Sequence, residues 1–274
     1  TMVSITLQLN DFEGFNFETS TKKIYSIAET IDFIKNNKEK NNLIYSWNRI
    51  EANLKNFGDG LIFCNKIDSR KKKKKLEMLK FNKPRFLKSL SYFCFWNRSS
   101  VKIFNYIFIN YYSYFRKKAY KDNFSNVIFP FLGKEYYFSF FGSKGFIENQ
   151  ILIPYEKVIP FINDFKKLID FHKPVITLFS VKEMSGEHKY LRFEGNMITL
   201  SVNIVKNKKK LNFINDLDKL YISYEVVPSI IKDSGLKKEV FNKCYIFANK
   251  FREDLKDFDN KRSYKSELSD RLEL

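Results

Sequence analysis

The feature that most constrains the fold is the spacing of apolar residues between positions 145 and 224. Some stretches have apolar residues at alternate positions or in short β-branched runs, which is typical of strands, and others have them at every third or fourth position, which is typical of amphipathic helices. The predicted strands are 145–154, 175–184, 189–194 and 197–205, and the predicted helices are 156–171 and 211–224. Strand groups with a helix laid on each favour an α+β fold, an antiparallel sheet with flanking helices, over a parallel βαβ array.

The first half of the chain shows a weaker pattern. Residues 1–10 alternate apolar and polar positions and predict a strand, so the chain is expected to start inside a sheet. A helix is expected over 22–36 and strands over 43–47 and 60–67. The stretch 80–142 is rich in aromatic residues but has few periodic signals, so we expect loops and short strands around a hydrophobic patch there.

The chain is strongly basic, with 49 Lys and Arg against 31 Asp and Glu and a formal charge of +18. This excess suits an anionic partner such as nucleic acid, a phospholipid surface or a phosphorylated substrate. The lysine run 71–75 and the basic aromatic stretch 100–121 are the candidate footprints, and solvated surface loops are the simpler interpretation of both. Lys, Asn, Ile, Phe and Tyr are all over-used, as in proteins of AT-rich genomes, so the charge alone does not identify a partner.

Cysteine and histidine are scarce, which removes several kinds of site. Cys64, Cys94 and Cys244 lie far apart without CxxC spacing, so the sequence indicates neither a disulfide framework nor a zinc site, and a reducing compartment is expected. Only His172 and His188 are present, which leaves almost no material for histidine-based metal sites or Ser-His-Asp triads. No apolar run reaches the roughly 18 residues of a membrane span.

Short motifs in a fixed order carry a family resemblance. They are YSW (45–47), GLIFC (60–64), LKFNKP (79–84), GFIENQILIP (145–154), VKEMSG (181–186), GNMITLSVNI (195–204), KDS (232–234) and SDRLEL (269–274). In this order they resemble the C-terminal two thirds of FAD-linked oxidases of the vanillyl-alcohol oxidase type, most closely the decaprenylphosphoryl-ribose oxidases and their bacterial relatives. No single motif is highly specific, and the resemblance depends on their order over nearly the whole chain.

The resemblance implies FAD as the cofactor and hydride transfer to it from a secondary alcohol of a sugar or a polyprenyl-phosphate sugar. It implies that residues 1–13 are the last strand of an FAD-binding domain, 14–224 a substrate-binding domain, and 225–274 a return segment that packs on the FAD domain. The Gly-rich segment for the FAD pyrophosphate is absent from the chain, so an N-terminal FAD-binding segment is an expected partner. The expected location is the cytoplasm, with peripheral contact at a membrane surface as an extension.

Lys232 is the first candidate site residue. In the family, a lysine in the same Lys-Asp-Ser context lies near the flavin, where a fixed cation stabilises the negative charge of the reduced ring. We therefore expect Lys-Asp-Ser to end a strand at the flavin and to start a helix. The alternative is that Asp233 or Ser234 only caps that helix and that Lys232 is solvated.

Lys182 and Gln150 are the candidates for positioning the alcohol. The resemblance places Lys182 on a strand facing the substrate cavity and Gln150 on a strand lining the cleft between flavin and substrate, although Asn149 replaces the usual aromatic neighbour. An amide can both donate a hydrogen bond to a sugar hydroxyl and accept one from it. An outward-facing strand lysine and a polar residue on a wet sheet face are the respective alternatives.

Three further residues complete the predicted site. Trp47 resembles an aromatic wall of the substrate pocket, with a core tryptophan as the alternative. Asn196 is expected to contact substrate and Thr199 to contact the flavin, because both belong to the strand that faces the ring in relatives. Thr199 stands where some relatives have cysteine, which argues against thiol chemistry. No metal site is predicted, and the catalytic base is unassigned.

Two other classes of function compete with the oxidase. The chain could be a non-catalytic binding module, or one half of a split enzyme, because the pyrophosphate cradle is not in it. A basic nucleic-acid-binding protein is the less favoured interpretation, and its affinity would fall steeply with salt; we predict no nucleic acid partner.

Overall fold

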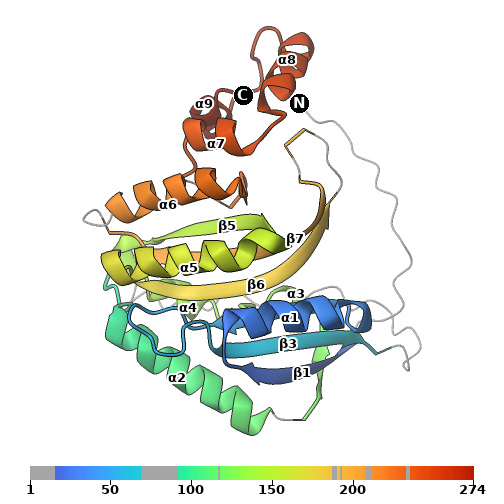
Figure 1. The fold of residues 1–274 in the computed structure, drawn as a ribbon, viewed down its shortest axis with the longest axis vertical. Coiled ribbons are helices and arrows are strands. Elements are labelled where there is room, and N and C mark those ends of the chain that lie inside the picture. The colour runs from blue at the N-terminus through green and yellow to red at the C-terminus, as the bar shows by residue number, and fades with distance from the viewer. Residues whose placement is uncertain are drawn as a thin grey trace.

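The computed structural model describes residues 16–68, 92–116, 118–186, 190–191, 193–207, 211–232 and 235–274. Within these ranges the chain forms a mixed fold in which all strands belong to one eight-stranded sheet, with every neighbouring pair antiparallel (Figure 1). The strand order is β4-β1-β3-β2-β6-β7-β5-β8. The predicted antiparallel sheet with flanking helices is therefore confirmed.

The strands are β1 (Asn16–Ile24), β2 (Leu43–Asn48), β3 (Gly60–Ile67), β4 (Tyr120–Asn123), β5 (Phe146–Pro154), β6 (Ile176–Gly186), β7 (Gly195–Val205) and β8 (Val227–Pro228). The helices are α1 (Ile27–Asn37), α2 (Arg98–Phe115), α3 (Phe124–Ile128), α4 (Tyr136–Ser139), α5 (Tyr155–His172), α6 (Leu211–Tyr224), α7 (Lys238–Cys244), α8 (Ala248–Phe258) and α9 (Glu267–Leu272). The predicted strands at 43–47, 60–67, 145–154, 175–184 and 197–205 and the predicted helices at 156–171 and 211–224 agree with these elements within a few residues.

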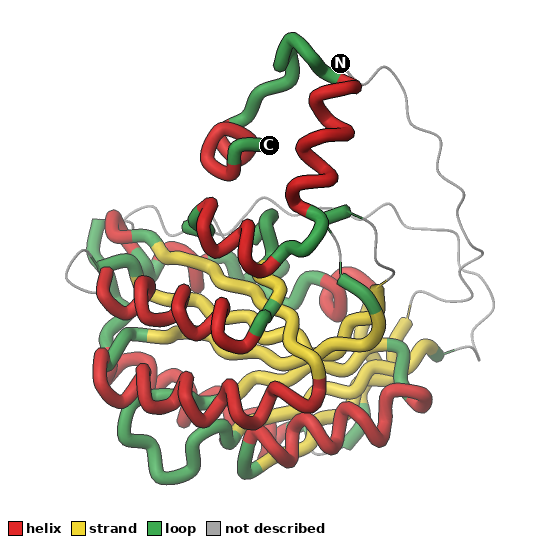
Figure 2. Tube along the Cα trace, turned by 45° about the horizontal axis from the view of Figure 1, so that its top comes forward, coloured by secondary structure: helices red, strands yellow, loops and turns green. Residues whose placement is uncertain are grey.

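One face of the sheet, called here the helix-covered face, carries the main core. Alternate residues of β5 and β7, such as Ile153, Ile198 and Leu200, point to this face and are fully buried with Phe161 and Phe165 of α5. Burying each such side chain contributes about 1.5–3 kcal/mol, so the alternation in the sequence determines which face the helices cover. Helices α1, α5 and α6 form the layer on this face (Figures 1 and 2).

The opposite face, called here the second face, is covered only in part. On β2 and β3 the alternate residues Trp47, Leu61 and Phe63 belong to an aromatic cluster with Trp96 and Phe141. Helices α2 and α4 close this cluster, through side chains such as Phe104, Phe108, Tyr112, Tyr137 and Phe138. Along β5, β7 and β6 the same face becomes polar, and this part holds the candidate site.

The sheet is built from two four-stranded halves that meet at a narrow seam between β2 and β6. Among the described residues, the only ladder pair that joins them is Tyr45 with Lys182. A buried serine reinforces the seam: the Ser46 hydroxyl accepts a hydrogen bond from the Val181 backbone N–H at 3.0 Å and lies 2.5 Å from Asn48 Oδ1. Ser46 thus provides a cross-seam contact beyond the single pair.

The prediction of loops and short strands over 80–142 is wrong for residues 98–115, which form the 18-residue helix α2. Its N-terminus has a capping box, in which the Asn97 side chain accepts from the Ser100 backbone N–H and the Ser100 hydroxyl accepts from that of Asn97. The helical period was hidden because large apolar residues lie on every side of α2, including its exposed side.

Three smaller predictions are also corrected. The predicted helix 22–36 starts too early, because β1 runs to Ile24 and the Ser26 side chain caps α1 by accepting from the Glu29 backbone N–H. The strand predicted at 189–194 is not formed by its described residues, which lie in the connection from β6 to β7, with Tyr190 at a φ of +54°. The predicted opening strand and the lysine run lie outside the described residues.

The expectation that Lys-Asp-Ser ends a strand and starts a helix is wrong. Strand β8 ends at Pro228 and α7 begins at Lys238, with Lys237 at the N-cap position and no side-chain cap. Lys232 lies in a turn between them, where its backbone N–H donates to the Ser229 hydroxyl at 3.3 Å. The predicted capping by Asp233 or Ser234 therefore does not occur at α7, and these two residues lie outside the described ranges.

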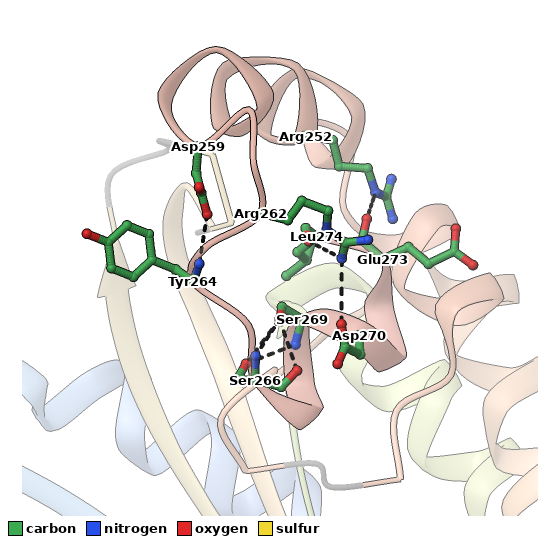
Figure 3. Close-up of polar contacts among 9 residues, drawn as sticks. All are labelled: Arg252, Asp259, Arg262, Tyr264, Ser266, Ser269, Asp270, Glu273 and Leu274. Carbon is green, nitrogen blue, oxygen red and sulfur yellow. Dashed lines mark hydrogen bonds and ion pairs between the residues drawn. The ribbon is translucent and has the colours of Figure 1, made fainter. Parts of the chain in front are cut away.

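The helices α7, α8 and α9 gather at one end of the molecule beyond α6 (Figures 1 and 2). Arg252 of α8 donates to the backbone carbonyls of Leu272 and Glu273 at 2.8 and 2.7 Å, and Arg262 lies 3.6 Å from Asp270 (Figure 3). The Tyr245 hydroxyl donates to the Pro228 carbonyl and so ties this region to the edge strand β8. The position of Lys232, between β8 and α7, is thereby anchored on both sides.

Candidate functional site

The candidate site is a polar patch on the second face of β5, β7 and β6. Cross-strand pairing places Gln150 opposite Ser201, Ser201 opposite Ser180, and Thr199 opposite Lys182. Successive side chains of a strand point to opposite faces, so residues two apart in these strands share the face. The patch, named here the polar patch, consists of Glu148, Gln150, Ser180, Lys182, Thr199 and Ser201. Most of its residues are half-buried.

Lys232 joins the polar patch from outside the long strands. Its Nζ lies 3.2 Å from Oε1 of Glu148, with 49% of the lysine side chain and 30% of the glutamate side chain exposed. The edge strand β8 pairs with β5, and the backbone N–H of Ser229 donates to the Gln150 carbonyl at 2.7 Å. These contacts hold the turn that carries Lys232 beside the end of the patch.

Lys182 is the most perturbed charge of the patch. Burial lowers its pKa from the usual lysine value, the positive charge of Lys232 lowers it further, and the negative charge of Glu148 opposes both. Two cations and one anion thus interact at one place on the sheet, although they come from β6, β5 and the turn after β8. A lysine with a lowered pKa loses its proton more readily than a surface lysine and can exchange it with a ligand hydroxyl.

Thr199 is fully buried, and its Oγ1 has no hydrogen-bond partner among the described residues. A buried hydroxyl without a partner costs about 1–3 kcal/mol. The neighbour of Lys182 on β2, Tyr45, is also affected by its surroundings, since burial raises the pKa of its phenol well above the usual range. The phenol of Tyr45 therefore remains protonated beside Lys182.

The structure separates two of the predicted site residues from the polar patch. Trp47 is buried in the aromatic cluster, where its Nε1 donates to Asn105 Oδ1 at 3.0 Å and its ring lies 4.7 Å from that of Phe108. Asn196 is three residues from Thr199, so the two point to opposite faces of β7. Asn196 accepts from the Ser185 hydroxyl at 2.5 Å and lines a hollow of about 280 Å³ next to the ion pair of Lys38 with Glu183.

Glu148 is the residue that the sequence interpretation missed. A signal was present, because Glu148 lies two positions before Gln150 in the same strand and must share its face. What the sequence did not reveal is that the turn carrying Lys232 would approach this end of β5.

Among the described residues, no histidine belongs to the polar patch. His172 ends α5, and its Nε2 lies 2.9 Å from Asp216 Oδ2, whereas His188 lies outside the described residues. Within the ranges given above, no three His, Cys, Asp or Glu side chains converge as metal ligands. The chemistry of the patch therefore depends on lysine, carboxylate, amide and hydroxyl groups.

No protein-family model matches the chain, and no curated protein matches it in sequence. Among the helices in the described part of the chain, none is long and apolar enough to span a bilayer.

Proposed function

We propose that the chain is the substrate-binding part of an FAD-linked oxidoreductase that oxidises a secondary alcohol of a sugar or sugar-lipid. The observation that carries the proposal is the convergence of Lys182, Lys232 and Glu148 on a half-buried sheet face. The sequence motifs that suggested the family place both lysines in one site, and they come together although one belongs to β6 and the other to the turn after β8.

The donor set of the patch fits a flavin and a polyol. Lysine ammonium groups can stabilise the negative charge of a reduced ring, and the half-buried Gln150 amide can bond to a hydroxyl group. FAD, when bound, accepts a hydride from the carbon that bears the alcohol. Lys232 would hold the charged edge of the cofactor, and Gln150 with Lys182 would orient the alcohol hydroxyl and take part in its proton transfer.

The buried aromatic cluster and the polar patch lie on the same sheet face but have different proposed roles. Trp47 is buried under α2 and stabilises the fold, so the ligand would contact the polar strands and not this ring. Asn196 is likewise left out of the proposed ligand contacts, because its side chain is on the helix-covered side of β7. The proposed ligand contacts are therefore Lys232, Lys182 and Gln150, whereas the fully buried Thr199 lies beneath them.

The test is FAD binding by the chain joined to an N-terminal FAD-binding segment, as the wild type and as two matched variants. Lys232→Met removes the proposed cofactor contact, whereas Lys219→Met removes a lysine on the far side of the molecule's core, on α6, whose side chain is 77% exposed. We expect the affinity for FAD, measured by quenching of flavin fluorescence, to fall roughly tenfold in Lys232→Met because one charged contact is lost. The affinity should stay unchanged in Lys219→Met.

Anaerobic addition of sugar alcohols to the FAD-loaded protein then tests the reaction, since a substrate would bleach the visible flavin absorbance. Absence of FAD binding, or equal binding by both variants, contradicts the proposal.

FAD binding without bleaching by any sugar alcohol would leave the second candidate function, a non-catalytic module for anionic or hydroxylated ligands. The open, half-exposed pair of Lys232 and Glu148 favours that candidate, because such a pair can exchange partners without a flavin.

A further inference from the structure

Helix α2 is apolar on two opposite sides. One side packs into the aromatic cluster, through Val101, Ile109 and the rings of Phe104, Phe108 and Tyr112. The other side faces solvent with Ile103, Tyr106, Ile107, Tyr114 and Phe115, each between 60% and 71% exposed. With Tyr111, which is 46% exposed, these residues recur at three- and four-residue spacing and form one stripe, named here the α2 stripe.

The α2 stripe lies at the outside of the molecule, where α2 runs along its lower edge (Figure 1). An open hollow of about 620 Å³ follows the second half of the helix, and its described lining comes entirely from α2. Monomeric soluble proteins rarely leave such a contiguous apolar patch uncovered, and a larger patch of this kind marks an interaction surface.

The charged residues of the chain segment that carries α2 have a single sign, although Glu51 accepts a hydrogen bond from Asn105 on the buried side of the helix. No Asp or Glu occurs between Glu77 and Asp122, while Arg98 and Lys102 are exposed in the first turns of α2 and Arg116 and Lys118 are exposed just after its end. Cations at a helix N-terminus oppose the helix dipole and lower helix stability, so Arg98 and Lys102 are unfavourable for α2 alone. An anionic partner would offset this cost.

We infer that the α2 stripe docks on an anionic phospholipid surface, with the helix lying in the plane of the headgroups. Exposed Ile, Tyr and Phe side chains with flanking Lys and Arg are the composition of an interfacial helix. Each cation near an anionic leaflet adds to the attraction, which falls off within a Debye length. A second copy of the chain is the less suitable occupant, because it would bring the same cations together in a protein of formal charge +18.

Nucleic acid fits the surface less well than lipid. Single-stranded nucleic acid binds through stacking on aromatic rings, and Ile103 and Ile107 at the centre of the α2 stripe offer no ring. Branched aliphatic side chains instead gain free energy when they enter the boundary between headgroups and acyl chains. The inference does not depend on the proposed flavin chemistry, since no residue of the polar patch takes part.

The experiment is co-sedimentation of the protein with phosphatidylcholine vesicles and with vesicles that also contain phosphatidylglycerol. The variant Tyr106→Ser/Ile107→Ser removes two exposed apolar side chains of the α2 stripe. The control Phe171→Ser/Phe258→Ser removes two side chains that are more exposed, at 78% and 80%, and lie elsewhere in the molecule. We expect binding to the anionic vesicles to fall at least roughly tenfold in the first variant and to stay unchanged in the control.

A charge variant, Arg98→Glu/Lys102→Glu, measures the electrostatic contribution to vesicle binding. We expect it to abolish the preference for phosphatidylglycerol and the salt dependence of binding. All of these side chains are exposed, so circular dichroism should show the native fold in every variant. Equal vesicle binding by the α2 and control variants would overturn the inference. A wild-type dimer that the α2 variant dissociates, without any vesicle binding, would assign the stripe to a second copy and would also overturn it.

Discussion

The ammonium nitrogen of Lys232 lies 3.2 Å from Oε1 of Glu148, and this ion pair connects the turn after β8 to the first half of β5. Lys182 of β6 interacts electrostatically with both groups. The pair is half-exposed, and isolated exposed pairs contribute at most about 1 kcal/mol to folding. Its main effect is therefore expected on the protonation of Lys182.

The first prediction concerns the pKa of Lys182 in variants of its two neighbours. Glu148→Gln removes the negative charge that raises this pKa, so the pKa should fall below its wild-type value. Lys232→Met removes the positive charge that lowers it, so the pKa should rise. NMR titration of lysine side chains labelled at Cε measures both shifts, and a shift of the same sign in the two variants would contradict the arrangement described here.

The second prediction concerns the cost of burying Lys182. Burial lowers the pKa of Lys182 in the folded state below the usual lysine value of 10.5, so the unfolded chain binds the proton more tightly and the charged lysine destabilises the fold at neutral pH. Lys182→Met should therefore raise the free energy of unfolding at neutral pH. The advantage should shrink as the pH rises from the folded pKa towards 10.5, because the wild-type lysine then becomes neutral as well.

Urea unfolding across this pH range measures the difference. Lys167→Met is the matched control, because the Lys167 side chain is 78% exposed on α5. A destabilised Lys182→Met variant at neutral pH would mean that the methylene chain and the ion cluster stabilise the fold more than the buried charge destabilises it.

The third prediction concerns the seam between the sheet halves. Ser46→Ala removes the acceptor of the buried Val181 N–H and should lower the free energy of unfolding by about 1–3 kcal/mol. Ser99→Ala, at an exposed position near the start of α2, should change it by less than about 0.5 kcal/mol. Equal stabilities of the two variants in urea unfolding would show that Ser46 does not support the seam.

The fourth prediction separates a core role of Trp47 from a pocket role. Trp47→Ala should lower the free energy of unfolding by about 3–5 kcal/mol, since it empties the centre of the aromatic cluster. Trp47→Phe should cost less, because it keeps a ring but leaves Asn105 Oδ1 without its indole donor. A tryptophan that only lined a ligand pocket would give variants of nearly wild-type stability, and thermal unfolding distinguishes the two cases.

The fifth prediction concerns the cysteines. Burial raises the pKa of Cys64 to about 11 and that of Cys244 to about 12, so both remain thiols at neutral pH and react slowly. Cys94 is partly exposed. An aromatic disulfide reagent should therefore modify Cys94 first in the native protein and all three cysteines after unfolding. Rapid native modification of the Cys94→Ser variant would contradict this order.

The elements that sequence periodicity predicted well are those that bury one face. Strands β5 and β7 and helices α5 and α6 place their apolar residues against a single core, so their periods survive in the sequence. Helix α2 was missed for the opposite reason, since Ile103 and Tyr106 face solvent while Phe104 and Phe108 are packed against the sheet. The period disappears when both sides of a helix are apolar.

The candidate site was predictable only in part. Alternation within one strand places Gln150 and Glu148 on the same face, and it also separates Asn196 from Thr199, so these relations could be read from the sequence. The approach of Lys232 could not, because it depends on β8 pairing at the edge of the sheet and on contacts such as the Tyr245 hydroxyl with the Pro228 carbonyl. Contacts between elements distant in sequence leave no periodic signal.

Lys182 belongs to two parts of the structure, because it pairs with Tyr45 at the seam and also lies in the polar patch. The backbone of Lys182 is part of the joint between the two half-sheets, and its side chain belongs to the polar patch. Any change in the pairing of Tyr45 with Lys182 would therefore displace a residue of the polar patch, above a core that both half-sheets share.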